Sequence, residues 1–118
     1  MPTPSDITRL TQTMTIDLTT VGRYSGRPSR IEIWWFHVED RFIITGTPGK
    51  RDWFANVLAD PNVTIHAPFG DYPGQAAIVT DEAFRRRVFT DPGIGWYRTQ
   101  AELDRLVELA PMIEVVLA

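Results

Sequence analysis

The feature that most constrains the fold is a set of short segments in which apolar residues recur at every second position. Met14, Ile16 and Leu18 alternate with polar residues, and the pattern returns near Ile31, Val63 and Ile113. Alternation of this kind is typical of β-strands with one buried face. Two short apolar runs between turn formers add further strands. The expected strands cover residues 14–19, 30–38, 41–46, 63–67, 75–80 and 113–117.

Helical spacing appears only in short stretches between these strands. Apolar residues recur at helical intervals over residues 50–59, 81–90 and 103–110. Asp60 precedes a proline and should end the first of these helices. The segment from Thr99 to Glu102 matches a capping box before the third. Residues 70–74, which are rich in turn formers, are expected to form a turn.

This order of elements predicts an α+β, mainly β fold. Tight turns join the first three strands, so they should pair antiparallel, and single helices between strands do not follow the regular alternation of a doubly wound sheet. A split antiparallel β-barrel of about six strands with two to three flanking helices leaves few exposed edges. The 118 residues suit a single domain, with residues 1–12 as a loose N-terminal arm.

Composition narrows the function classes. The formal net charge of −3 argues against a nucleic-acid-binding surface, and the absence of cysteine excludes thiolate chemistry. We find neither an apolar run long enough to cross a membrane nor a signal sequence, so a cytoplasmic protein is expected. His37 and His66 lack metal-ligand spacing and are interpreted as solvated or hydrogen-bonded. Serine-nucleophile and Gly-rich nucleotide motifs are missing as well.

Two glycine-flanked basic loops carry the strongest chemical signal. Residues 22–30 and residues 46–53 hold five of the twelve cationic side chains, and the second loop leads into a helix. A helix N-terminus has partial positive charge and binds anions. The five cations, which could form one anion-binding rim or belong to two ordinary solvated turns, are Arg23, Arg27, Arg30, Lys50 and Arg51.

Aromatic residues close to these loops point to a flat ligand. Trp34, Trp35 and Phe36 are consecutive, so they must face both sides of a strand. Trp35 and Phe54 are expected in the core. Trp34 and Trp53 are candidates for a pocket wall.

Three ordered motifs resemble the deazaflavin-dependent nitroreductase family. Residues 18–26 (LTTVGRYSG) are similar to the TTxGRxSG opening of that family, and residues 30–35 (RIEIWW) follow at its spacing. Residues 52–65 resemble its W-x-x-N-L-x-x-x-P-x-V-x-V segment. Together the motifs cover about residues 14–67, and their common order is more specific than any one of them.

The resemblance implies a split β-barrel oxidoreductase that binds coenzyme F-420, a deazaflavin with a phosphate and a glutamate tail, as its cofactor. The reduced cofactor would pass a hydride to a quinone, nitro compound or activated alkene. Arg23, Ser25, Gly26 and Arg30 would hold the tail, with Lys50 and Arg51 adding charge. The remaining implied contacts are Thr45, Gly46 and Thr47 under the ring, Trp53 as a wall, and Asn56 as a tie between helix and barrel.

Other interpretations of these residues stay open at this point. The second choice of cofactor is FMN, and a non-enzymatic lipid- or fatty-acid-binding protein could use the same barrel. Tyr97 is a weak candidate for a proton donor, and the chain could be a monomer or a homodimer. Two residues depart from the family pattern. Tyr24 stands where the family usually has a basic residue. Glu32 would place an anion near the ring, where it would disfavour an anionic reduced cofactor.

Overall fold

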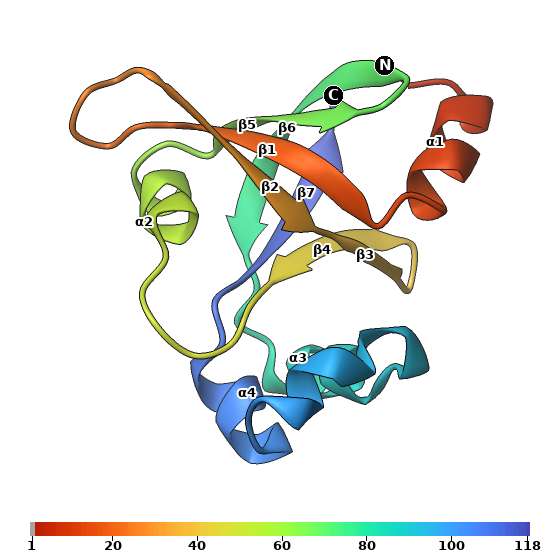
Figure 1. Ribbon diagram of the computed structural model, residues 1–118, viewed down its shortest axis with the longest axis vertical. Coiled ribbons are helices and arrows are strands. Elements are labelled where there is room, and N and C mark those ends of the chain that lie inside the picture. Colours follow the sequence, from red (N-terminus) through yellow and green to blue (C-terminus); the bar gives the residue numbers. More distant parts are fainter. Residues whose placement is uncertain (1) are drawn as a thin grey trace.

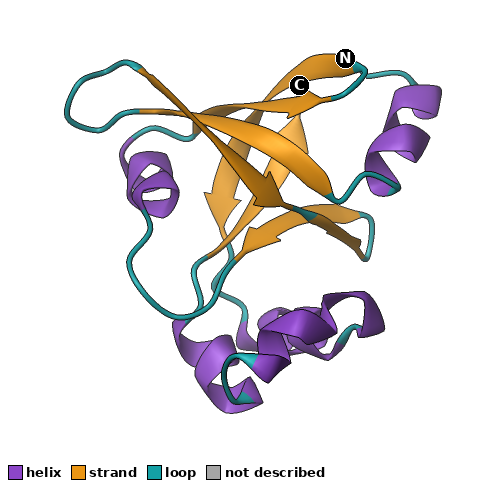
Figure 2. Ribbon diagram, in the orientation of Figure 1, coloured by secondary structure: helices purple, strands orange, loops and turns teal. Residues whose placement is uncertain are grey.

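The computed structural model describes residues 2–118 and contains one seven-stranded, fully antiparallel sheet (Figures 1 and 2). Its strand order is β2-β1-β5-β6-β7-β4-β3. The strands are β1 (Thr15–Val21), β2 (Pro28–Trp34), β3 (Phe36–Val38), β4 (Arg41–Thr45), β5 (Asn62–Ala67), β6 (Gly70–Ile78) and β7 (Met112–Leu117). The helices are α1 (Pro4–Thr11), α2 (Asp52–Ala59), α3 (Glu82–Thr90), the 3₁₀ segment η1 (Pro92–Thr99) and α4 (Leu103–Leu109).

The sheet curls because its two edge strands are consecutive in the chain. β2 and β3 lie at opposite ends of the strand order, yet only Trp35 separates them. Trp35 turns into the core, stacks on Phe42 at a centroid distance of 4.2 Å and donates from Nε1 to the carbonyl of Thr13. The segment expected as one strand over residues 30–38 is therefore two strands. The predicted split-barrel class is confirmed.

Two apolar clusters support this sheet. The first fills the barrel and contains Trp35, Ile65 and Val115, with Trp53 of α2 packed against one side. The second lies between β4, β7 and the layer formed by α3, η1 and α4, and it contains Phe84, Leu106 and Met112. Figure 1 shows α2 beside the barrel and the α3–α4 layer at one end. No helix within residues 2–118 has the length and hydrophobicity needed to cross a membrane.

The N-terminal segment corrects the expected loose arm. Thr3 and Asp6 form a reciprocal capping box, which starts α1 with two side-chain-to-backbone hydrogen bonds of 3.1 Å. Leu10 of this helix is completely buried in the barrel cluster. The capping box expected at Thr99–Glu102 is wrong. Thr99 ends η1, and Glu102 precedes α4 without a side-chain cap.

The turn expected over residues 70–74 is also wrong. These residues begin β6, and the actual turn is formed by Pro68 and Phe69. Gly74 lies in a strand and not in a turn. The absence of a side chain there lets β7 approach β6 closely, because a Cβ on Gly74 would lie 2.6 Å from the carbonyl oxygen of Val116. The expected hairpin between β3 and β4 is confirmed, with Glu39 and Asp40 both at positive φ.

Candidate functional site

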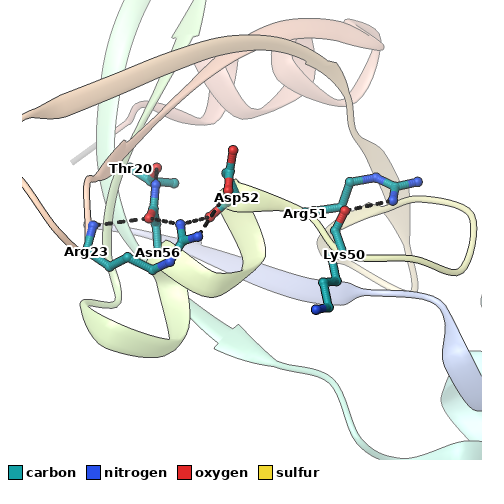
Figure 3. A network of polar contacts seen from close by, with 6 residues as sticks. All are labelled: Thr20, Arg23, Lys50, Arg51, Asp52 and Asn56. Carbon is teal, nitrogen blue, oxygen red and sulfur yellow. Dashed lines mark hydrogen bonds and ion pairs between the residues drawn. The ribbon is translucent and has the colours of Figure 1, made fainter.

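The loop of residues 46–51, here called the basic loop, connects β4 to α2 and is braced from within. The Arg51 guanidinium donates to the Thr47 hydroxyl at 2.9 Å and to the carbonyls of Thr47 and Lys50, each at 3.1 Å (Figure 3 shows the Lys50 bond). Gly49 has φ +139°, and a Cβ at that position would lie 2.9 Å from Arg51 Nη1. Arg51 thus holds the loop's shape, and glycine is required beside it.

A second network fastens the Arg23 loop to α2 (Figure 3). Asn56 accepts from the backbone N–H of Arg23 at 3.1 Å and from its guanidinium at 2.9 Å. The Asn56 amide donates to the Thr20 hydroxyl at 3.0 Å, which is the tie between helix and barrel expected for this residue. Arg23 also pairs with Asp52 at 3.1 Å, and this hydrogen bond raises the pKa of Arg23.

Among the cations of this area, Lys50 is the one whose charged group has no partner within residues 2–118. Its side chain makes no hydrogen bond or ion pair within residues 2–118 and is exposed. Arg23, Lys50 and Arg51 nevertheless line one hollow of about 420 Å³ on the surface of α2, together with Asp52, Phe54 and Leu58. The structure therefore brings three of the five predicted cations together, and leaves one of them free to bind an anion.

A larger cavity of about 880 Å³ adjoins this hollow, because Gly49 and Phe54 line both. It opens between α2 and the α3–α4 pair. Val107, Leu109 and Pro111 provide apolar wall. The charged residues along it are Glu82, Arg85, Arg86, Asp104 and Glu108. We call the two hollows together the groove.

Arg85 is a feature of this groove that the sequence did not reveal. Its side chain is buried, and it donates to the carbonyls of Val107 at 2.6 Å, Ala110 at 2.5 Å and Val79 at 3.0 Å. Burial lowers the pKa of Arg85. The bonds join α3 to the end of α4, where a cation complements the helix dipole. No motif signals this role, since Arg85 is one of three consecutive arginines.

The other predicted tail-binding residues lie elsewhere. Arg30 sits on the outer face of β2, where its Nε donates to Asp17 at 2.8 Å. The Ser25 hydroxyl accepts from the backbone N–H of Arg27 and so closes its own turn. Gly26 lines a separate hollow next to Thr19 and Pro73. The structure does not bring these residues to the groove.

The residues expected to contact the ring of the cofactor also lie at different places in the structure. The Thr45 hydroxyl is buried and donates to the Pro111 carbonyl at 2.6 Å. Gly46 also lies close to Pro111, because a Cβ added to this glycine would be 3.7 Å from the Pro111 ring. Trp53 is buried in the barrel cluster. Trp34 is half-buried and meets Trp96 edge to face at 5.5 Å, away from α2. Phe54, expected in the core, is partly buried and packs against the barrel cluster, and it also lines both halves of the groove.

Tyr97 is poorly placed to donate a proton in the groove. It packs edge to face against Phe36 and Phe89 in the second cluster and lines neither hollow. Burial raises its pKa to about 12. Such a hydroxyl keeps its proton at neutral pH.

Solved structures similar to this chain share its fold. A conserved hypothetical protein, Rv2991 from Mycobacterium tuberculosis, aligns with a TM-score of 0.75 and 18% identity over 99% of this chain and 81% of its own. A putative pyridoxamine 5'-phosphate oxidase from Listeria innocua gives 0.71 and 15% over 94% and 89%. An F420-H2 dependent reductase (FDR-A) gives 0.63 and 20% over 86% and 93%.

The sequence family is defined by a separate comparison. The search among curated proteins gave no match. The sequence model of one family, described as F420H(2)-dependent quinone reductase, matches residues 5–108. This span runs from α1 into α4 and includes the basic loop, α2 and most of the groove wall. The chain therefore belongs to the F420H(2)-dependent quinone reductase family and is a deazaflavin-dependent oxidoreductase.

Proposed function

We propose that the groove binds coenzyme F-420 and that the hydride acceptor is an uncharged quinone. The observation that carries the cofactor site is the Lys50 ammonium, which has no partner within residues 2–118 and lines the smaller of two adjoining hollows. The smaller hollow, lined by three cations and by Asp52, which pairs with Arg23, keeps an excess of positive charge that suits a phosphate and a glutamate tail. The larger one, with Phe54 and Pro111 in its wall, suits a flat ring.

The residues present fit such a ligand. Lys50 can bind a phosphate or carboxylate as a mobile point charge. Arg51 and Arg23 add positive potential while their own bonds keep the loops in place. Gly49 lets the backbone approach the ligand closely, because no side chain projects from it.

When bound, a deazaflavin would supply the hydride, and the residues of the groove would orient it and limit access of water. Phe54 and Leu109 present apolar surface along the groove. No nucleophilic side chain is required. Because Tyr97 lies in the second cluster and retains its proton, the proton that completes the reduction comes from solvent.

The charges around the larger cavity select the acceptor. Glu82 and Asp104 form ion pairs with Arg86, so Glu108 is the carboxylate along the cavity that has no ion-pair partner within residues 2–118. A carboxylate-bearing acceptor would meet this negative charge, and an uncharged quinone would not. The family description, which names a quinone, agrees with this choice.

A fluorescence titration with oxidised F-420, run beside FMN, tests the cofactor site. We expect saturable binding of F-420 at micromolar concentration or tighter, and weaker binding of FMN. Absence of F-420 binding would overturn the proposal, and an acyl ligand found by native mass spectrometry would favour a lipid-binding protein. The acceptor is tested by oxidation of reduced F-420 with an uncharged benzoquinone and with its carboxylated derivative. Equal rates would contradict the selection by charge.

A further inference from the structure

A polar chain of three residues crosses the outer face of the sheet, outside the groove. The Thr19 hydroxyl lies 2.7 Å from His66 Nε2, and His66 Nδ1 lies 2.8 Å from Asp71 Oδ1. The residues come from β1, β5 and β6, which are adjacent antiparallel strands. A rigid sheet therefore fixes a hydroxyl, an imidazole and a carboxylate in line.

The hydrogen bonds determine which atom donates when the imidazole is neutral. An ionised carboxylate only accepts, so Nδ1 must donate to Asp71. In a neutral ring Nε2 is then the acceptor, and the Thr19 hydroxyl donates to it. This is the arrangement of nucleophile, general base and orienting carboxylate used in hydroxyl-based acyl transfer. The His66 side chain is only 13% exposed, whereas Asp71 is 70% exposed.

The surroundings of Thr19 provide space and a cation. A hollow of about 280 Å³ beside it is lined by Val21, Pro28, Thr64 and Gly74, among others. That volume suits a short acyl group rather than a long chain. Arg30 stands opposite Thr19 in the β1–β2 register. Its Nε is bonded to Asp17, and its two terminal nitrogens make no hydrogen bond within residues 2–118.

We propose that Thr19 is a nucleophile that accepts a short acyl group from an activated ester or thioester. Thr19 Oγ1 forms a bond to the acyl carbon while its proton passes to His66 Nε2. The bond to the leaving alkoxide or thiolate breaks, and that group takes up the proton from His66. The terminal nitrogens of Arg30 stabilise the transient negative charge on the acyl oxygen. Water then attacks the threonyl ester with the same base, which releases the carboxylic acid and restores Thr19.

The experiment uses the full chain and p-nitrophenyl acetate. Release of p-nitrophenolate is followed by absorbance, and peptide mass mapping after a short reaction locates the acetyl group. We expect an acetyl ester on Thr19, and a loss of at least about 100-fold in the rate of its formation in His66→Asn, the size typical of a removed general base. Thr19→Val should abolish the ester, and Thr19→Ser should retain it.

Thr15→Val is the matched control. Thr15 lies on β1 and on the same face of the strand as Thr19, but it is not among the residues that line the hollow, and within residues 2–118 it forms no hydrogen bond with His66. This variant should react like the natural protein. Acetylation confined to Lys50 or the N-terminus, or an unchanged rate at Thr19 in His66→Asn, overturns the proposal. The outcome is independent of F-420 binding, because no residue of the groove takes part.

Discussion

Arg85 shows how one buried side chain can hold two elements together. Its guanidinium satisfies carbonyls at the end of α4 and at Val79, just after β6, and no carboxylate within residues 2–118 pairs with it. Apolar replacement would leave these buried carbonyls without donors. An unsatisfied buried polar group costs roughly 1–3 kcal/mol.

We therefore expect Arg85→Met to lower the free energy of unfolding by about 3 kcal/mol, since several carbonyls lose their donor together. Urea unfolding followed by tryptophan fluorescence measures this change. Arg86→Met is the matched control on the next residue of α3, because the side-chain bonds of Arg86 within the described residues are exposed ion pairs. It should change stability by less than about 1 kcal/mol. Similar losses in both variants would show that the carbonyl bonds of Arg85 contribute little.

Tyr97 makes a prediction about alkaline pH. Its pKa is raised from 10.0 to about 12 in the folded protein by burial. Below pH 10 the hydroxyl is neutral in the folded and in the unfolded protein, so Tyr97 does not lower the free energy of unfolding there. Above pH 10 the unfolded chain ionises first, and stability falls by up to about 1.4 kcal/mol per pH unit until the folded-state pKa is passed.

Tyr97→Phe removes this decline. We expect the loss of unfolding free energy between pH 9 and pH 11 to be about 1 kcal/mol smaller in the variant, a figure that follows from the slope above. Tyr72, whose pKa is also raised, contributes equally in both proteins and cancels from the comparison. An identical pH dependence of the two proteins would contradict the assigned shift.

Among the elements, α1 is the least expected part of the barrel's support. The helix is short and half of its residues are exposed, yet it inserts Leu10 into the barrel cluster that also contains Trp35. Leu10→Ala should lower the free energy of unfolding by about 2–5 kcal/mol, the range for a buried leucine. Leu58→Ala, at a position that is 65% exposed, should have little effect. A small loss in both would mean that α1 detaches without consequence for the sheet.

Local patterns predicted most elements because burial and period agree in them. In β1, for example, Ile16 and Leu18 face the core as alternation requires. The pattern failed where tertiary contacts overrode local preference. Trp35 interrupts an apparently continuous strand because its indole is needed in the core, and Gly74 lies in a strand because β7 passes close to it.

The residues of the groove were only partly predictable, because tertiary contacts that the sequence does not show decide where some side chains lie. The cations of the basic loop are close in sequence, so their grouping follows from one turn. Arg23 joins them through the Asn56 network, which a motif can suggest. Arg30 appeared equivalent, but strand geometry directs its side chain to the outer face and toward Asp17. Phe54 has the helical spacing of a core residue and packs against the barrel cluster, but the sequence does not show that it also lines both halves of the groove.

At the scale of the whole molecule, charge opposes the proposed cofactor while one side chain favours it. The formal net charge is −3, so an anionic ligand approaching from far away is repelled. Lys50 offers a local positive charge at the groove. Salt screens both effects, because the Debye length falls from about 30 Å at 0.01 M to about 8 Å at 0.15 M.

A pair of charge-matched variants separates the local effect from the global one. Lys50→Gln and Arg98→Gln each remove one positive charge, but Arg98 is exposed on η1 and lines neither half of the groove. At 0.01 M salt we expect Lys50→Gln to weaken F-420 binding about 10- to 100-fold, as the loss of a charge-assisted hydrogen bond implies. Arg98→Gln should weaken it only slightly. Raising the salt to 0.5 M should shrink the difference between the two variants, because screening also weakens the contact in the natural protein. Equal effects at low salt would mean that F-420 responds to net charge alone, and Lys50 would then lie outside the cofactor site.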